Sequence, residues 1–255
     1  RLGNYVQKFR RSYLVSDLQE AVDSVGPAKV AQAEAKAIRE LKRDIEKTLC
    51  SNNDRQAETG SVPYKMRGLG KWLANASFTT TSDGAIAAAS DVPSDFRTPD
   101  TSAVDVAGEF TENELNGIIT SIFKETGTTN NLTLIADTAL RTDIADFARI
   151  QDTGNSVMRR VMMENGEAEI KQTVDLYQSD HGIVSIVNAN PDCMPDTTPA
   201  NIQGYVLNPE YAGIHELIPM GSTRLPNLGG GERGFVDCAL TLGVYHPAAH
   251  GKIMS

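Results

Sequence analysis

The sequence predicts an α+β fold in two lobes, and three observations support this prediction. Residues 27–50 carry one apolar stripe at helical spacing. Residues 132–189 alternate short apolar runs with a helical segment, as in a lobe that mixes strands and helices. A further apolar run at 235–245 indicates a long strand near the end of the chain. The 255 residues suffice for one large domain or two small ones, and they contain no internal repeat.

Residues 4–15 predict the first strand. Its aromatic residues, among them Phe9 and Tyr13, share one side, whereas basic residues occupy much of the other. Such a strand has little surface to bury, so we expect a projecting ribbon rather than a core strand. Because the chain starts at Arg1 and not at an initiator methionine, we also expect further residues upstream, including a strand that pairs antiparallel with residues 5–15.

The strongest helix of the sequence is expected at 27–50. A short helix from about residue 17 precedes it, and a glycine–proline pair separates the two. Apolar residues recur at steps of three and four, and charged residues fill the remaining faces. We expect Ile38, Leu41 and Ile45 to be its most buried positions. The polar flanks are either a solvated face or contact surfaces for neighbouring subunits.

The segment 76–109 changes character, because it is rich in small and polar residues and weak in periodicity. Over 76–115 one basic residue stands against eight acidic ones, a local charge of −7. This composition indicates a long exposed, poorly packed loop between subdomains. A second helix then begins with a capping box, Thr111 and Glu114, and Gly127 is its expected end. Its buried stripe is expected to comprise Leu115, Ile118, Ile119, Ile122 and Phe123.

Short strands and one helix follow in alternation. The helix is expected at 138–150, and a turn at 179–182 predicts that the strands on either side of it pair as a hairpin. A proline-rich stretch at 191–199 is expected to be a loop. The expected strands of this part are 132–136, 173–178, 182–189, 205–207 and 235–245.

The composition excludes several classes of function. The chain carries 24 Lys and Arg against 33 Asp and Glu, and a formal charge of −9 has the wrong sign for a general nucleic-acid binder. Aromatic residues make up only 6% of the chain, too few for a large platform that stacks bases or sugars. No apolar run approaches the ~20 residues that a membrane-spanning helix needs.

Neither the cysteines nor the glycines form a recognisable site. The cysteines lie far apart without a C-x-x-C pattern, which indicates isolated thiols in a reducing compartment; they are Cys50, Cys193 and Cys238. The pattern G-x-G-x-x-G occurs at Gly229, Gly231 and Gly234. It binds phosphate where a strand leads into a helix, but here a strand is expected to follow, so we interpret it as a flexible connection between strands.

The histidines give no convincing chemistry either; they are His181, His215, His246 and His250. His246 and His250 stand four apart, as metal ligands on a helix can, but Pro247 argues for an irregular segment. His181 lies in the expected hairpin turn, where it is favoured for backbone reasons. We assign no catalytic, cofactor-binding or metal-binding residue. The enzyme alternative, a small hydrolase that uses His181 or His250, lacks paired donors in the sequence.

Several segments together resemble one family in the same order along the chain. They are xELKRDIExxL at 39–49, Lys-Met-x-Gly-Leu at 65–69, T-E-x-x-L at 111–115, V-D-L-Y-x-S-D-x-G-x-V at 174–184, Y-V-L-N-P-E-Y at 205–211 and AHGKI at 249–253. Each motif is weak alone, but their sequence is fairly specific. The chain resembles the major head (capsid) protein of tailed bacteriophages, in the group related to phage SU10. The segment 76–109 matches nothing in this pattern.

The resemblance implies the HK97 capsid fold and a division of the chain. Under this division, the chain begins with an E-loop strand and continues into a peripheral domain that contains the spine helix. An axial domain follows, and the chain then returns to the peripheral domain. The implied bounds are 1–16 for part of the E-loop, 17–75 for the peripheral domain with the spine helix at 27–50, 76–109 for an acidic loop or insert, 110–212 for the axial domain and 213–255 for the return.

The resemblance also implies a function without catalysis or cofactors. The chain would be a structural subunit that self-assembles into the icosahedral or prolate head of a tailed phage and encloses its DNA genome. Its implied partners are copies of itself in hexameric and pentameric capsomers, with portal, scaffold or decoration proteins, and DNA only non-specifically. The implied location is the virion, assembled in the cytoplasm of the host bacterium. An encapsulin-like nanocompartment shell is the alternative, since it would share the fold.

Overall fold

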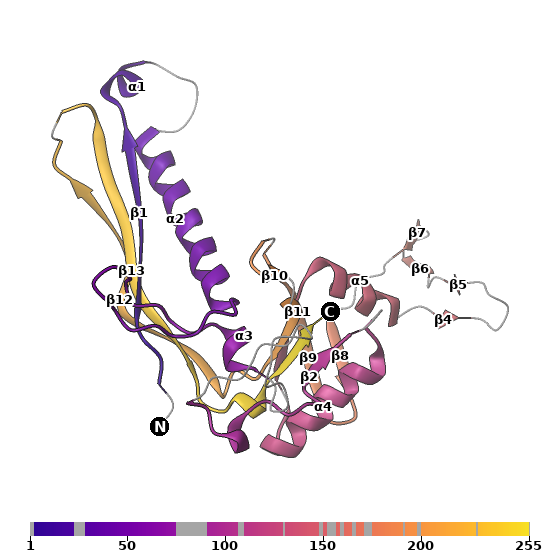
Figure 1. Ribbon diagram of the computed structural model, residues 1–255. Coiled ribbons are helices and arrows are strands. Elements are labelled where there is room, and N and C mark those ends of the chain that lie inside the picture. The colour runs from indigo at the N-terminus through magenta and orange to yellow at the C-terminus, as the bar shows by residue number, and fades with distance from the viewer. Residues whose placement is uncertain are drawn as a thin grey trace. The chain divides into compact units, whose positions relative to one another are not determined.

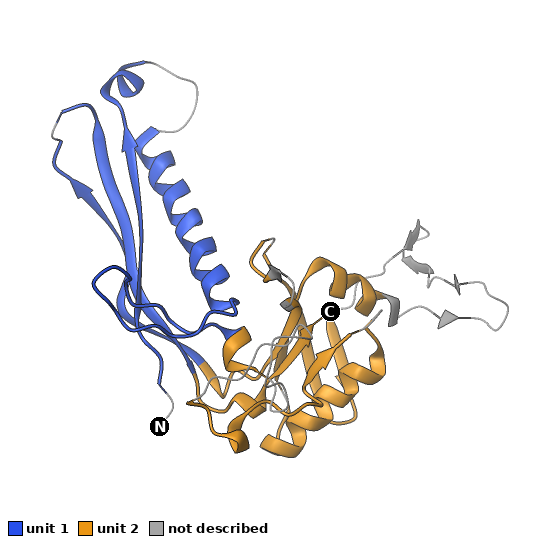
Figure 2. Cartoon of the chain, viewed as in Figure 1, with its two compact units in different colours: residues 1–69, 213–243 blue, residues 70–212, 244–255 orange. Residues whose placement is uncertain are grey.

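The structure, a computed structural model, divides the chain into two compact units (Figure 2). Unit 1 comprises residues 1–69 and 213–243, and unit 2 comprises residues 70–212 and 244–255. The residues that the structure describes are 3–22, 29–74, 91–106, 110–129, 131–147, 150–151, 157–158, 161–164, 167–170, 175–190, 192–197, 200–227 and 229–254.

Unit 1 is a three-stranded antiparallel sheet with one long helix packed on it (Figure 1). The strand order is β1-β13-β12, so the first strand of the chain pairs with one of the last. The register between β1 and β13 runs without interruption from Gln7 opposite Leu240 to Val15 opposite Glu232. The elements of this unit are β1 (Gln7–Val15), α1 (Asp17–Ala21), α2 (Lys29–Leu49), β12 (Ala212–Leu225) and β13 (Glu232–Val244).

The expectation that the strand at 4–15 has little surface to bury is wrong for β1. Phe9, Tyr13 and Val15 alternate along the strand and are all buried against α2 and the facing side chains of β13. Two aromatic rings and a valine suffice to hold the strand against the core, because each ring buries about 150–250 Å². The partner lies more than 200 residues along the chain, a distance that strand patterns do not reveal.

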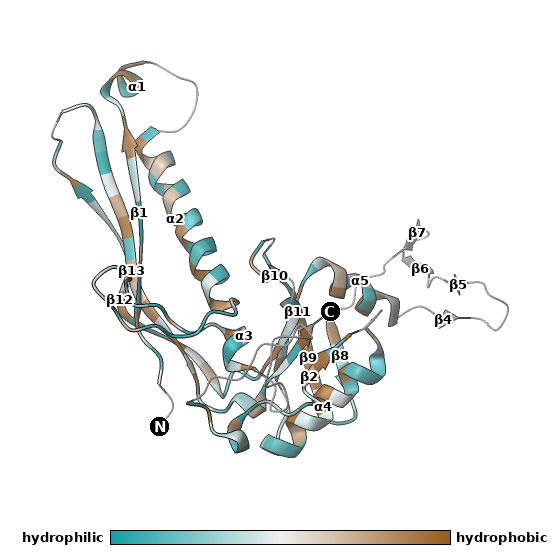
Figure 3. Cartoon of the chain, viewed as in Figure 1, coloured by the Kyte–Doolittle hydropathy of each residue, from teal (hydrophilic) through white to brown (hydrophobic). Residues whose placement is uncertain are grey.

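The long helix is confirmed as α2, and hydrophilic and hydrophobic residues alternate along it (Figure 3). Leu41 and Ile45 are buried as expected, but Ile38 is only half-buried. Ala37 takes the buried place instead, together with Val30. A small side chain at this position lets helix and sheet approach closely, and the larger Ile38 packs at the edge of the core.

Unit 2 is built on a mixed sheet with the strand order β2-β14-β11-β3-β9-β8, and β10 pairs with β11. Helices α4 and α5 contribute to a core in which Leu115, Ile118 and Leu140 are completely buried. The strands are β2 (Ala103–Asp105), β3 (Leu132–Ala136), β8 (Leu176–Ser179), β9 (Gly182–Asn188), β10 (Asp196–Thr197), β11 (Ala200–Leu207) and β14 (Gly251–Met254).

The helices of this unit are short apart from α4 and α5, and two small hairpins lie outside the main sheet. The helices are α3 (Leu69–Trp72), α4 (Glu112–Thr126) and α5 (Thr138–Phe147), with 3₁₀ turns η2 (Ser94–Phe96) and η3 (Pro247–Ala249). The hairpins pair β4 (Ile150–Gln151) with β5 (Val157–Met158), and β6 (Val161–Glu164) with β7 (Glu167–Ile170).

Local signals predicted the start and end of α4 correctly. The Thr111 hydroxyl accepts from the Glu114 backbone, the Glu114 carboxylate accepts from the Thr111 backbone, and Gly127 adopts the left-handed conformation. The hairpin of β8 and β9 is also confirmed, with Ser179 opposite Gly182. Phe123, expected in the buried stripe, is 40% exposed, and Ser121 is buried in its helix instead.

Two expectations about connections are corrected. Residues 91–106 are not loosely packed: β2 pairs with β14, and Val92, Thr98 and Val106 are buried. The rest of the predicted loop, 75–90 and 107–109, lies outside the described residues. Residues 244–255 do not return to the unit of the long helix, because β14 hydrogen-bonds with β11 and β2 inside unit 2.

Candidate assembly surfaces

The histidines considered for chemistry have structural surroundings. His250 is fully buried; its Nδ1 accepts a hydrogen bond from the Asn208 backbone N–H at 3.1 Å, and Nε2 lies 3.4 Å from the Tyr211 carbonyl oxygen. Burial lowers the pKa of His250 to about 4, so the ring is neutral at pH 7. His181 lies in the β8–β9 turn and stacks on Phe123, with ring centroids 5.5 Å apart.

The other candidates do not form a site either. The three cysteines are free thiols and all are buried, and burial raises the pKa of the Cys238 thiol. Gly229, Gly230 and Gly231 have positive φ angles and form the connection from β12 to β13, as interpreted from the sequence. Within the described part of the chain, no three metal-ligating side chains gather, and no helix is long and apolar enough to cross a membrane.

What the structure does offer is exposed apolar and charged surface. The first such surface is on unit 1, along β12. Ile214, Leu217 and Ile218 are 54%, 70% and 44% exposed in one short stretch of a fourteen-residue strand. The sequence pattern does not predict this strand, because a proline and two glycines interrupt its alternation and neither face is fully buried. Exposed apolar runs of this kind mark contact surfaces.

The face of the unit 1 sheet opposite α2 carries basic side chains. Lys8 forms an ion pair with Asp237 across the strands at 3.0 Å. The Arg10 guanidinium lies 3.8 Å from the centre of the Phe235 ring, a cation–π contact. These contacts hold both cations flat on β13 and leave their outer sides open to a partner.

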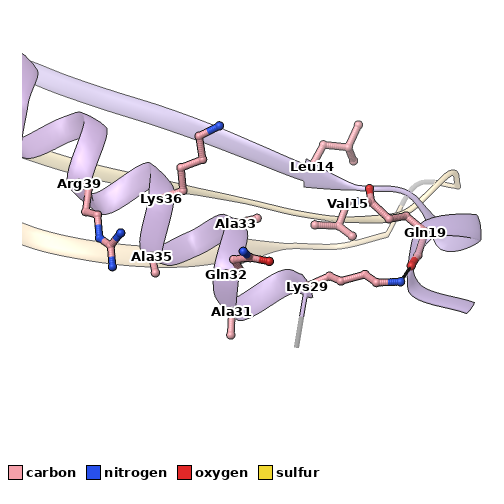
Figure 4. A pocket seen from close by; sticks show the side chains of 10 residues that line it. All are labelled: Leu14, Val15, Gln19, Lys29, Ala31, Gln32, Ala33, Ala35, Lys36 and Arg39. Carbon is pink, nitrogen blue, oxygen red and sulfur yellow. Dashed lines mark hydrogen bonds between the residues drawn. The ribbon is translucent and has the colours of Figure 1, made fainter. Parts of the chain in front are cut away.

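The second surface is a cavity of about 670 Å³ in unit 1 (Figure 4). It lies between the end of β1, α1 and the first half of α2. Lys29 crosses one end, where its amine donates to the backbone carbonyl oxygens of Gln19 and Val22. The lining residues are Leu14, Val15, Gln19, Lys29, Ala31, Gln32, Ala33, Ala35, Lys36 and Arg39.

The third surface lies on the edge of the unit 2 sheet. Leu176 is 59% exposed and pairs with Ser185 of β9, so it is diagonal to Ile183 and Val187 on the same face of the sheet. Ile183 and Val187 are exposed too, whereas the alternate residues Val184 and Ile186 are buried in the core. The three side chains therefore form an apolar patch on the face of β8 and β9 that points away from the core.

The comparisons with known proteins point in one direction. The SU10 major capsid protein family matches residues 1–255, the whole chain. The chain is similar in structure to the capsid of the cyanophage P-SCSP1u, with a TM-score of 0.58 at 12% identity over 98% of this chain and 73% of that one. No curated protein matches the chain.

Two further structures show the same fold. The similarity to the Gordonia phage Cozz structure has a TM-score of 0.58 at 12% identity, over 98% of this chain and 70% of that one. The similarity to the holo-SrpI encapsulin complex from Synechococcus elongatus has a TM-score of 0.54 at 11% identity, over 98% of this chain and 73% of that one. The expected HK97-like fold is confirmed by these similarities.

Proposed function

Because this chain belongs to the SU10 major capsid protein family, it is a structural subunit of a tailed-phage head, and we propose that it works by self-association alone, without turnover of any substrate. The whole-chain family match is the observation that carries this function. We assign unit 1 to the peripheral domain with α2 as its spine helix, and unit 2 to the axial domain. Strand β1 is then the inner end of the E-loop.

The surfaces described above support association. A stable interface buries about 1,200–2,000 Å² in total, and its centre is apolar with a polar rim. The exposed stretch of β12 in unit 1 and the patch of Leu176, Ile183 and Val187 in unit 2 each present apolar side chains beside charged ones. They are different surfaces, so contacts that join them are heterologous and close into rings such as hexameric and pentameric capsomers.

The finer partners belong to the same proposal. The head encloses DNA, which we expect the subunit to contact only non-specifically, in keeping with its formal charge of −9. Portal, scaffold or decoration proteins are expected at special positions of the shell, and assembly is expected in the cytoplasm of the host before the protein becomes part of the virion.

An encapsulin-like shell is the second candidate, favoured by the similarity to the Synechococcus elongatus encapsulin complex. The family match to a phage capsid family favours the phage head. The genes beside this one distinguish the two: terminase and portal genes accompany a phage head, and a gene for a cargo enzyme accompanies a nanocompartment.

Self-association is tested by light scattering of the purified chain over a concentration series, with negative-stain microscopy of the same samples. We expect rings or shells, and species of capsomer size or larger at high concentration. A chain that stays strictly monomeric at the highest concentration would overturn the proposed function.

A further inference from the structure

The two units carry opposite charge. Unit 1 contains 15 Lys and Arg against 12 Asp and Glu, a formal charge of +3. Unit 2 contains 9 against 21, a formal charge of −12. The charge of −9 for the whole chain is therefore the sum of a basic unit 1 and an acidic unit 2, and all of the excess acid lies in unit 2. Such a division favours contacts between the unlike units of two copies over contacts between like units.

The cavity of unit 1 concentrates this positive charge. Lys29, Lys36 and Arg39 line it, and none of its ten lining residues is Asp or Glu. Lys36 is 77% exposed, and its ion pair with Glu40 has a long separation of 3.9 Å. By contrast Arg11, on the neighbouring strand, lies 3.0 Å from Glu40 and 3.8 Å from Asp44. Lys36 and Arg39, both exposed, can thus contact an outside anion, whereas the Lys29 amine is held by the carbonyl oxygens of Gln19 and Val22.

We propose that this cavity receives a carboxylate-bearing surface from unit 2 of a second copy of the chain. The inference rests on the proposed function and names the surfaces of one subunit contact. Leu14 lines the cavity and is 66% exposed, so the partner surface has to supply apolar contact as well as negative charge.

One part of unit 2 meets both requirements. At the end where α4 meets the β8–β9 turn, Glu125 and Asp180 are exposed, and neither forms an ion pair among the described residues. Phe123, in the last turns of α4 with Glu125, is 40% exposed and stacks on His181, the residue after Asp180. Two exposed carboxylates and an exposed aromatic ring complement the exposed Lys36, Arg39 and Leu14 of the cavity, and this surface is the expected occupant.

The test uses paired charge reversals in the full chain. Lys36→Glu with Arg39→Glu reverses the cavity, and Lys42→Glu with Lys47→Glu reverses two exposed cations of the same helix outside it. Light scattering gives the concentration at which half of the chain is associated, and circular dichroism checks that each variant folds. We expect the first pair to raise that concentration at least about tenfold and the control pair to change it far less.

Rescue identifies the partner. Glu125→Lys with Asp180→Lys should weaken association as the cavity reversal does, and the four substitutions together should restore it. The inference is wrong if the wild type associates and the cavity reversal associates at the same concentration. It is also wrong if the fourfold variant associates no more strongly than either pair of substitutions alone. In both cases the proposed function stands. A wild type that never associates overturns both. If the cavity reversal associates normally but loses binding to a short DNA duplex, the cavity is a DNA site and the inference is also overturned.

Discussion

The two units bury their cores to different depths. In the main core of unit 2, twelve of fifteen residues are at most 1% exposed. In the core between α2 and the sheet of unit 1, only three of eleven reach that level. A seven-stranded sheet with two helices on its core side can enclose residues completely, whereas one helix on a three-stranded sheet leaves the margins open.

Unit 1 also exposes more large hydrophobic side chains than unit 2. Among the described residues, eight large exposed hydrophobic side chains belong to unit 1 and six to unit 2. Unit 2 thus resembles a self-sufficient domain, and unit 1 resembles an element whose surface is completed by other copies. For a shell subunit, this separates folding from assembly: the first depends mainly on unit 2 and the second on unit 1.

The largest difference in folding stability should appear when an apolar residue is replaced by Asp once in the core of unit 2 and once on the surface of unit 1. Ile118→Asp in unit 2 buries an unpaired carboxylate at a position with no exposure, at a cost of several kcal/mol against a total stability of about 5–15. It should prevent folding. Leu217→Asp in unit 1, 70% exposed, should leave the melting temperature within a few degrees and weaken association. The comparison would fail if Leu217→Asp unfolded the chain.

The elements that local patterns determine were predictable from the sequence. Helix α4 was predicted from its capping box to its terminal Gly127, because every signal lies within the helix or one residue outside it. The β8–β9 hairpin was predictable for the same reason. The pairing of β1 with β13 and the parallel pairing of β2 with β14 were not, since each joins segments separated by more than 140 residues.

The candidate surfaces were less predictable than the fold. The polar flanks of α2 were singled out as possible contact surfaces, but the cavity depends on β1 and α1 lying against that helix. Strand β12 was not predictable, because a strand that is exposed on both faces needs no alternation of apolar and polar residues. The sequence around His250 and Lys252 likewise does not predict their burial. The two residues lie on either side of a glycine, and both are completely buried.

Acid should loosen unit 2 before unit 1. The folded-state pKa of His250, about 4, lies below its ordinary value of 6.5, so the unfolded chain takes up the proton first as the pH falls. The contribution of His250 is complete above pH 6.5 and is lost between pH 6.5 and 4, on the order of 3 kcal/mol. Native-state hydrogen exchange should show the amides of unit 2 losing protection in that window.

A matched pair of variants isolates the effect. His250→Gln keeps a hydrogen-bond acceptor but does not titrate, so its unfolding free energy should fall less between pH 6.5 and 4 than that of the wild type. His181→Gln, at an exposed position, should behave like the wild type. Parallel pH profiles for all three proteins would show that His250 has no role in the acid response.

The core of unit 2 also contains a group that works against its stability. Lys252 is completely buried in β14, and its Nζ has no hydrogen-bond partner among the residues that the structure describes. Burial, with a smaller effect from Lys71, lowers its pKa to about 8. The charged form is therefore penalised in the folded state at every pH below 8, and the penalty disappears as the pH rises from 8 to 10.5.

Lys252→Met should consequently stabilise the chain. Met has a similar length and no charge, so the unfolding free energy at pH 7 should rise by about 1–3 kcal/mol, measured by chemical denaturation. Since the penalty vanishes at high pH, the gain should shrink toward pH 10.5. Lys124→Met, at an exposed position of α4, is the control and should change little. A loss of stability in Lys252→Met would mean that the amine has a favourable role in unit 2.

The smallest effects concern the helix caps, one in each unit. The Thr111 hydroxyl caps α4, which has five buried residues, and the Ser16 hydroxyl caps α1, which has none. Removal of a cap costs about 1 kcal/mol where the helix end is tied to the core, and much less where the first turn can fray freely. Thr111→Ala should therefore lower the unfolding free energy by about 1 kcal/mol, and Ser16→Ala by a few tenths at most. If chemical denaturation gave equal losses, α1 would be an integral part of the folded core of unit 1, and the view that this end of unit 1 is completed only by a second copy would have to be abandoned.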